Sequence, residues 1–207
     1  MNEQQITEAL SLFNSNAHKI MSHHGAPGDA PNRNPPHGVW LSALSHVQKP
    51  KVFLEIGSRY GLTAFYVIQG MSIDEDSLFI SVDLDYHRPR EAPPSLGFSQ
   101  NKKYFRDIRL KEYWGKTSND SYPAVKKYCQ DSCIQVDFLL IDGCHTYEGV
   151  KSDFLNYTNL LSKTGIVVLD DISSQAGVRK FYTEHIKNNF KTIESSSSDM
   201  CVVYDIG

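Results

Sequence analysis

The sequence predicts an α/β fold: a Rossmann-like, doubly wound, mostly parallel seven-stranded sheet with an antiparallel last strand and an N-terminal helical extension. Short, almost continuously apolar runs alternate with amphipathic helical segments, which is typical of a parallel sheet covered on both faces. An acidic residue ends or closely follows several of these runs. No helical pattern separates the last two runs, so we expect them to pair as antiparallel neighbours.

Each element is predicted from the period of its apolar residues. Apolar residues at helical spacing predict a first helix over residues 3–22. The remaining predicted helices cover residues 38–48, 62–70, 122–130, 147–162 and 175–188. The predicted strands cover residues 52–56, 78–82, 108–114, 136–141, 166–169, 190–193 and 200–204.

The pattern of apolar residues predicts two parts. These are an N-terminal helical extension over residues 1–48 and an α/β domain over residues 49–207, where strands and helices alternate. Residues 23–37 contain four prolines and two glycines, which predicts a loop without regular structure. We interpret this extension as a lid over the substrate. Three histidines flank or close the loop, and they are interpreted as surface residues, with a lid contact or a second metal site as alternatives: His23, His24 and His37.

Composition excludes several classes of protein. The 207 residues include 21 Lys and Arg against 24 Asp and Glu, a formal charge of −3, so no basic excess indicates binding to nucleic acid. No apolar run reaches the ~18 residues that a membrane span needs. The first residues lack the apolar core of a secretory signal. Four cysteines are too few for a disulfide scaffold, and together these observations predict a cytoplasmic protein with reduced thiols.

Acidic residues at the strand ends carry the main functional signal. In open α/β sheets, ligands bind beyond the carboxyl ends of the strands. The first turn, EIGSRYG over residues 55–61, has a glycine at 57 for a tight turn but not the G-x-G-x-x-G pattern of dinucleotide sites. Glu55 would repel a diphosphate, so this turn favours a cationic or zwitterionic ligand. Asp83, 26 positions after Gly57, can accept hydrogen bonds from ribose hydroxyls, and the pair indicates an adenosine-type nucleoside.

These segments resemble class I S-adenosylmethionine-dependent methyltransferases. LEIGSRYG over residues 54–61 is similar to their first motif, and Asp83 to their ribose-binding acid. A later block is similar to a subfamily written I-D-G-x-H-x-Y-x-x-V-x-x-D, which includes O-methyltransferases acting on sugars and natural products. The block comprises residues 137–150, Asp153, Leu160, Leu161, Gly165, Asp170, Asp171 and Ile172.

The resemblance implies roles for individual residues. Four residues would shape the methionine end of the S-adenosylmethionine site: Glu55, Gly57, Ser58 and Gly61. Asp83 would hold the ribose. Relatives often carry an acid in a G-D-S segment after the third strand, whereas this chain has Lys116, so only Thr117 is carried over as a contact near the adenine. The positions that bind a divalent cation in metal-dependent members correspond to Asp142, Asp170 and Asp171, and Asp142 also borders the cofactor site.

Elementary chemistry agrees with a cation at this edge of the sheet. Three carboxylates at neighbouring strand ends repel one another unless a cation or protons neutralise them. Oxygen ligands favour Mg²⁺, with Mn²⁺ or Ca²⁺ as alternatives. His145 lies three residues beyond Asp142 and is the candidate general base for a substrate hydroxyl.

The expected function is therefore O-methylation of a hydroxylated small molecule such as a sugar or natural product. The alternatives are a nicotinamide-dependent reductase and a non-catalytic nucleotide-binding protein on the same scaffold. Neither a nucleic acid nor a membrane is expected as a partner, and a homo-oligomer is left open. Residues 1–48 and 85–107 are expected to choose the substrate, because they contain the extension and the longest loop.

Overall fold

The computed structural model describes residues 4–5, 7–9, 11, 35–59, 61–84, 108–195 and 198–206. Most of the helix predicted over residues 3–22 lies outside these residues. So do residues 23–34 of the predicted loop, and the loop over residues 85–107. Among the helices of the described residues, none is both long and apolar enough to cross a membrane.

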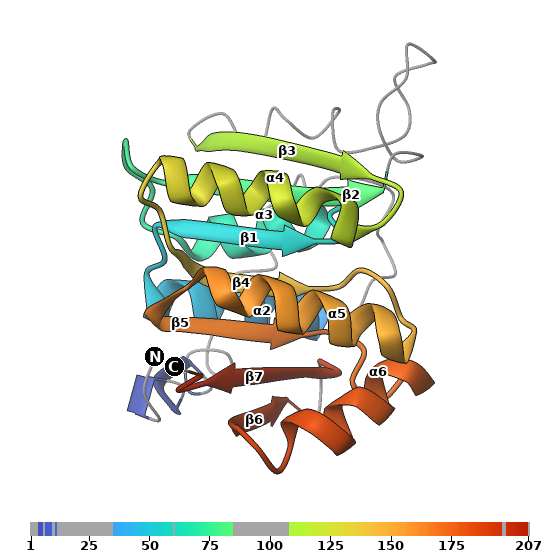
Figure 1. Cartoon of the computed structure of the whole chain (residues 1–207). Coiled ribbons are helices and arrows are strands. Elements are labelled where there is room, and N and C mark those ends of the chain that lie inside the picture. Colours follow the sequence, from blue (N-terminus) through green and yellow to red (C-terminus); the bar gives the residue numbers. More distant parts are fainter. Residues whose placement is uncertain are drawn as a thin grey trace, which may run out of the picture.

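The core of the molecule is a seven-stranded sheet in the order β3-β2-β1-β4-β5-β7-β6 (Figure 1). Strands β1 to β5 are parallel, and β7 pairs antiparallel with both β5 and β6. This confirms the predicted doubly wound architecture with its antiparallel last strand. The strands are β1 Val52–Ile56, β2 Leu78–Leu84, β3 Arg109–Gly115, β4 Val136–Ile141, β5 Leu161–Leu169, β6 Lys191–Ser195 and β7 Met200–Tyr204.

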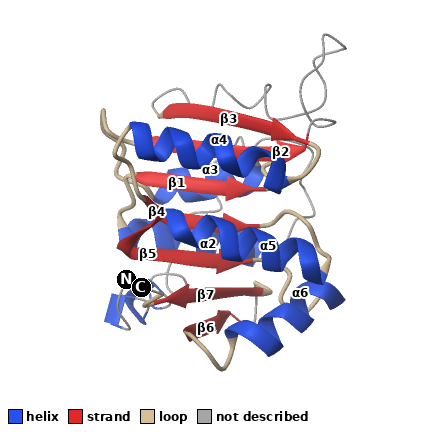
Figure 2. Ribbon diagram, in the orientation of Figure 1, coloured by secondary structure: helices blue, strands red, loops and turns tan. Residues whose placement is uncertain are grey.

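Helices cover both faces of the sheet, as Figure 2 shows. On one face lie α2 and α3, and on the other lie α4, α5 and α6. A 3-10 turn, Thr158–Leu160, follows α5, and a π-helical turn, Tyr182–Ile186, follows α6. The helices are α2 Pro35–Gln48, α3 Leu62–Gly70, α4 Ser118–Asp131, α5 Tyr147–Tyr157 and α6 Ala176–Phe181.

Alternation along the strands divides the core into two clusters. Phe53 stacks on Phe79 with ring centroids 4.9 Å apart, and both pack with Trp40 on the α2–α3 face. Leu54, the next residue along β1, packs on the opposite face with the side chains of α4, α5 and α6. Because successive side chains of a strand point to opposite faces, β1 contributes to both clusters. The helix α2 therefore shares a core with the sheet.

Several boundaries differ from those predicted; α4, for example, begins at Ser118 instead of residue 122. Helix α2 begins at Pro35, three residues before the predicted start. Proline is tolerated there, because the N–H groups of the first turn have no partner within a helix. Strand β5 begins at Leu161, where a helix end was expected, and Gly165 lies within it. Its pairing with β4 changes register between the pair Val136–Leu161 and the pair Phe138–Ile166. The strand is therefore irregular before Ile166.

Candidate cofactor and catalytic site

Backbone hydrogen bonds join the loops at the carboxyl edge of the sheet. The N–H of Gly57 donates to the carbonyl of Val82 over 2.9 Å, which joins the loop after β1 to β2. The N–H of Asp142 donates to Ile56 over 2.9 Å, and that of Asp170 donates to Ile141 over 3.2 Å. The ends of β2, β1, β4 and β5 therefore lie side by side, as the strand-end pattern predicted.

The loop after β1 requires glycine at two positions. Gly57 has a φ of 93°, and a Cβ there would lie 2.1 Å from the carbonyl oxygen of Asp142. No L-residue fits this place, because its side chain would occupy the backbone of the neighbouring loop. Gly61 has a φ of 73° and is the N-cap of α3. Both glycines predicted to shape the cofactor site thus have backbone conformations that favour glycine.

Glu55 and Ser58 are buried beneath this loop. The Glu55 carboxyl accepts a hydrogen bond from the hydroxyl of Thr63 in α3. Burial raises the pKa of Glu55 to about 7, although hydrogen bonds from Thr63 and Ser58 act to lower it. The Ser58 hydroxyl also accepts from that of Ser81 over 2.8 Å. The two predicted residues therefore belong to one buried polar cluster between β1, β2 and α3.

Asp83 ties the end of β2 to the glycine loop. Its Oδ2 accepts from the backbone N–H of Arg59 over 2.5 Å, and its Oδ1 accepts from the N–H of Leu84 over 2.7 Å. Arg59 has a φ of 42°, so the carboxylate bonds to a tight turn of the chain. The side chain is only 5% exposed. Asp83, the predicted ribose acceptor, thus orders the loop after β1 from the end of β2.

Thr117 is the N-cap of α4. Its hydroxyl accepts from the N–H of Asp120, and the Asp120 carboxylate accepts from the N–H of Thr117, which together form a capping box. The following residue, Ser118, donates to the buried carboxylate of Asp153 in α5. The loop after β3, where an adenine contact was expected, is therefore held by its own cap and by α5.

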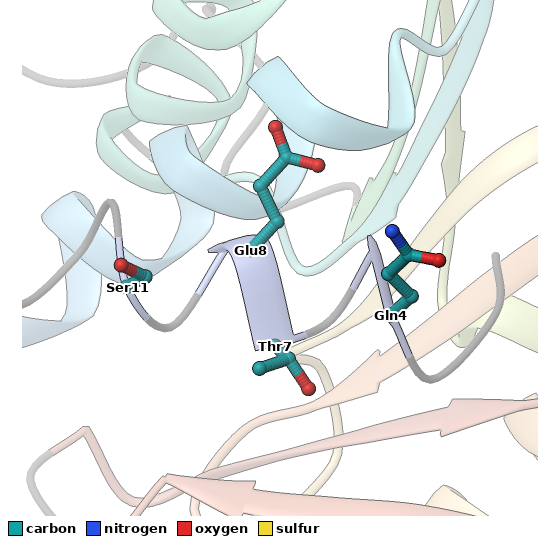
Figure 3. A pocket seen from close by; sticks show the side chains of 4 residues that line it. All are labelled: Gln4, Thr7, Glu8 and Ser11. Carbon is teal, nitrogen blue, oxygen red and sulfur yellow. The ribbon is translucent and has the colours of Figure 1, made fainter.

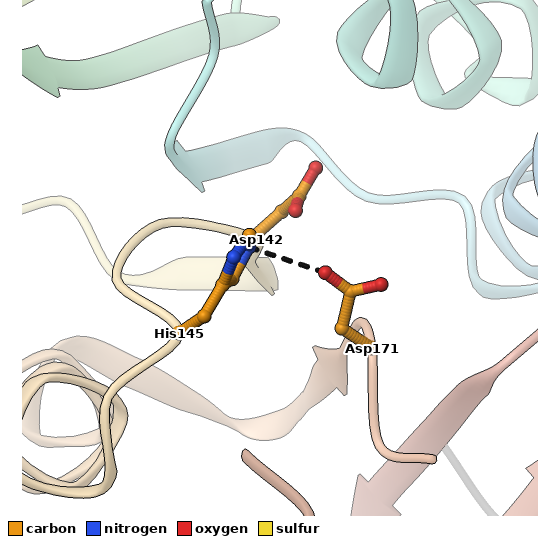
Figure 4. Close-up of side chains that lie close together, drawn as sticks. All are labelled: Asp142, His145 and Asp171. Carbon is orange, nitrogen blue, oxygen red and sulfur yellow. Dashed lines mark ion pairs between the residues drawn. The ribbon is translucent and has the colours of Figure 1, made fainter. Parts of the chain in front are cut away.

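Asp142, His145 and Asp171 come together at the ends of β4 and β5 (Figure 4). Their potential ligand atoms all lie within 4.8 Å of one another. The His145 Nε2 lies 3.1 Å from the Asp171 Oδ2, and the two side chains are 44% and 25% exposed. Carboxylate and imidazole groups at this spacing can hold a divalent cation, or they can orient a base.

The local backbone explains why these side chains meet. Thr146 caps α5 by accepting from the N–H of Gly149, so His145 directly precedes the helix. A Cβ on Gly177 would lie 2.3 Å from the carbonyl oxygen of His145, so the start of α6 presses against this loop. Asp171 has a φ of 60°, in the left-handed region. Its Oδ1 accepts from the hydroxyl of Ser174 over 2.7 Å, which leaves Oδ2 facing His145.

Asp170 lies apart from this group of three. Its Oδ1 is 3.5 Å from the Nε2 of His37, in the first turn of α2. The same oxygen accepts from the N–H of Asp171 over 2.8 Å. Burial acts to lower the pKa of His37, but the contact with Asp170 and the nearby carboxylates of Asp199 and Asp171 outweigh it, so the pKa is raised. The structure thus brings together two of the three predicted metal-binding aspartates with His145, and pairs the third with His37.

Asp199 and Asp153 are further candidates to which the sequence assigns no role. Asp199 precedes β7, and its carboxylate accepts from the N–H groups of Ser173 and Ser174 over 2.7 and 3.0 Å. It thereby holds the loop that carries Asp171. Nothing in the sequence around residue 199 indicates this contact. Asp153 is fully buried, and burial raises its pKa to about 6. Its place at the end of the I-D-G-x-H-x-Y block was the available signal.

A separate hollow borders the N-terminal segment (Figure 3). None of the residues predicted to bind cofactor or metal lines this hollow, so the candidate site remains the sheet edge. The residues that line it are Gln4, Thr7, Glu8 and Ser11.

A comparison with protein families shows to which family the chain belongs. Residues 54–172 match the model of a family described as a methyltransferase domain, which is more than half of the chain. The chain belongs to this methyltransferase family. The match runs from β1 to the loop after β5 and includes every predicted site residue. It favours the methyltransferase reading over the nicotinamide-dependent reductase.

Solved structures show the same fold at low sequence identity. An O-methyltransferase from Bacillus cereus in complex with S-adenosylhomocysteine aligns with a TM-score of 0.63 and 15% identity over 99% of this chain and 92% of its own. The O-methyltransferase TomG from Streptomyces achromogenes, in complex with S-adenosylmethionine, gives a TM-score of 0.62 and 13% identity over 100% and 92%.

A curated relative that the chain matches is a much longer protein. The uncharacterized protein y4gI of Sinorhizobium fredii is 27% identical over 196 residues, which cover 86% of this chain. The chain spans about a fifth of that relative, 19% of its length.

Proposed function

We propose that the protein is an S-adenosylmethionine-dependent methyltransferase that methylates a hydroxyl of a small molecule, such as a sugar or a natural product. One observation carries the proposal. The paired His145 and Asp171 lie with Asp142 at the sheet edge, beside the glycine loop of a methyltransferase domain. The printed descriptions of the structural neighbours, which name O-methyltransferases with S-adenosylhomocysteine or S-adenosylmethionine, support this reading.

The residues of the glycine loop fit the cofactor. Because Gly57 has no side chain, the loop after β1 packs directly against the backbone of the loop that carries Asp142, and these two loops would border the cofactor together. S-adenosylmethionine, when bound, supplies a methyl group on a sulfonium. The chain would bind it with residues from four strand ends. These residues are Glu55, Gly57, Ser58, Gly61, Asp83, Thr117 and Asp142.

The donor set at β4 and β5 fits a divalent cation. We assign the cation to the carboxylates of Asp142 and Asp171, and Mg²⁺ is the expected ion because oxygen ligands suit it. Asp170, the third aspartate of the predicted set, would have to turn from His37 to join them. A bound cation supplies positive charge that lowers the pKa of a nearby substrate hydroxyl.

His145 is the proposed general base. Its Nε2 is held 3.1 Å from the Asp171 Oδ2, so the carboxylate orients the ring and stabilises the imidazolium that forms when the ring accepts a proton. Its side chain is 44% exposed, which leaves it accessible to an acceptor molecule. Methyl transfer needs the acceptor oxygen in line with the methyl group, so holding both in place contributes much of the rate.

The test is a methyl-transfer screen across hydroxylated acceptors with radiolabelled S-adenosylmethionine, with Mg²⁺ or with a chelator. We expect transfer that Asp142→Ala and His145→Ala abolish and that Asp131→Asn leaves unchanged, because Asp131 is an exposed residue at the end of α4. Calorimetry with S-adenosylhomocysteine and NAD accompanies the screen. Binding of NAD without any response to S-adenosylhomocysteine would overturn the proposal. Transfer that is unaffected by a chelator would remove only the cation from it.

A further inference from the structure

We infer that His37, in the N-terminal helix α2, is a positioning residue for the catalytic group: through Asp170 it fixes the turn that directs Asp171 toward His145. The catalytic role of His145 rests on the proposed function, but the contacts that lead to it do not. His37 lies outside residues 54–172, so the methyltransferase-domain match does not include it.

The first step is the anchoring of His37. It lies in the first turn of α2, a helix whose Trp40, Leu41 and Leu44 are fully buried in the core. The backbone that carries the imidazole is therefore held against the sheet. The side chain is 26% exposed, and its Nε2 lies 3.5 Å from the Asp170 Oδ1. Its Nδ1 is buried and has no hydrogen-bond partner among the described residues, so within this part of the chain Asp170 is the polar group that orients the ring.

The second step runs from Asp170 to Asp171. The Oδ1 that faces His37 also accepts the N–H of Asp171 over 2.8 Å. Asp171 has a φ of 60°, which a non-glycine residue adopts only when its surroundings enforce it. Because the imidazole contacts this carboxylate oxygen, it holds the oxygen where it accepts the N–H of Asp171. His37 thus stabilises the unusual backbone of Asp171.

The third step is the direction of the Asp171 side chain. With the backbone fixed, Ser174 donates to one carboxylate oxygen over 2.7 Å and the other lies 3.1 Å from the His145 Nε2. If the turn relaxes, the Asp171 carboxylate moves and His145 loses its partner. His37 in α2 thereby positions the pair of His145 and Asp171, although its own polar contact is with Asp170.

The experiment observes the histidine rings directly in the full-length protein labelled with ¹⁵N-histidine. His145→Asn identifies the His145 ring signals, and His37→Leu removes the contact with Asp170. We expect His37→Leu to shift the His145 ring nitrogens and His37→Gln, whose amide can still donate to Asp170, to restore them toward the wild-type positions. His46→Leu is the matched control, because His46 is an exposed histidine of the same helix. We expect it to change none of these signals.

A second variant covers the case in which His37→Leu fails to fold. Asp170→Asn weakens the same contact from the other partner, and we expect it to shift the His145 signals in the same way. S-adenosylhomocysteine affinity should stay at the wild-type value in all of these variants. Where an acceptor is known, kcat for His37→Leu should fall by roughly 10- to 100-fold, because small misplacements of a catalytic group have effects of this size.

Two outcomes would overturn the inference. One is unchanged His145 signals in a folded His37→Leu protein. The other is an equal shift in the Leu and Gln variants together with lost S-adenosylhomocysteine affinity, which indicates a general structural role. If the ring signals respond as expected while no hydroxylated acceptor is methylated, the positioning contact stands and the proposed function is at fault.

Discussion

The loop after β1 and the loops after β4 and β5 lie at the same edge of the sheet, but they use their polar side chains differently. In the first region, Glu55 and Ser58 are almost completely buried, and their partners lie within the protein. In the second region, His145 and Asp171 are 44% and 25% exposed. Their paired atoms face Asp142 and the outside of the sheet edge.

The difference indicates which part of the candidate site is already ordered before a ligand binds. Buried polar groups must be hydrogen-bonded, and such a cluster stays in one arrangement. Under the proposed function, the first region would therefore be the preformed cradle for the cofactor. Exposed groups at close spacing can exchange protons and ligands with a substrate, so the second region suits chemistry. Single substitutions should therefore affect the two regions separately.

The largest effect is expected from His145→Ala. Removing a general base lowers the rate of transfer by roughly 100- to 10,000-fold, because proton transfer of this kind contributes that much. Affinity for S-adenosylhomocysteine should be unchanged, because the cradle at β1 is intact. Single-turnover rates and calorimetry on the same preparation measure both. A parallel loss of affinity would show that the two regions are not separable.

Gly57→Ala should damage the cradle. The new Cβ would lie 2.1 Å from the Asp142 carbonyl oxygen, at a φ of 93°, so the two loops must move apart. We expect a loss of roughly 2–4 kcal/mol in the free energy of unfolding, as strained and overpacked sites give, and loss of measurable S-adenosylhomocysteine binding. Gly143→Ala is the milder comparison, because its Cβ would meet a side-chain carbon, the Ile56 Cγ2, at 3.0 Å. Equal effects of the two changes would contradict the role given to Gly57.

Glu55→Gln should change how stability depends on pH. Burial raises the pKa of Glu55 from 4.5 to about 7 in the folded protein, so between these values the folded state holds a proton that the unfolded state has lost. This contribution to stability is complete below pH 4.5 and is lost as the pH rises to 7, by roughly 3 kcal/mol. The Gln variant cannot titrate, so its unfolding free energy should fall less over this range. Urea titrations at several pH values measure the difference, and parallel curves for the two proteins would contradict it.

The smallest effect is expected from Ser174→Ala. The change removes the hydroxyl that donates to the Asp171 Oδ1 over 2.7 Å, at a solvent-exposed position. One such hydrogen bond contributes about 1 kcal/mol, so we expect a fall of a few-fold in the transfer rate. A loss of stability of the same size would lower the melting temperature by only about 2–4 °C. If the free energy of unfolding falls by more than the transfer rate does when both are expressed in kcal/mol, the Ser174 hydroxyl has a structural role instead.

Much of the fold could be predicted because its determinants are local. Apolar runs such as residues 52–56 and 136–141 indicate buried parallel strands, and the lack of a helical sequence pattern between the last two runs indicates antiparallel neighbours. The start of β5 was missed because Ser162, Lys163 and Thr164 are polar and lie at an irregular register.

The site was predictable only in part. The sheet topology brings strand ends together, so Asp142 and Asp171 could be expected at one edge. It does not determine where each side chain points. Asp170 and Asp171 are adjacent in sequence, yet one faces His37 and the other faces His145. The clamp that Asp199 makes on Ser173 also joins residues 26 positions apart, for which a single sequence contains no pattern.

Strand β7 lies between β5 and β6, although it follows both in sequence. Its neighbour in the chain, Asp199, accepts the N–H of Ile172 through its carbonyl oxygen and those of the two following serines through its carboxylate. During synthesis, the loop that holds Asp171 therefore stays unclamped until the ribosome has released β7. The candidate site at β4 and β5 is therefore completed later in synthesis than the contact between the loops after β1 and β4, which needs only Ile56 and Asp142.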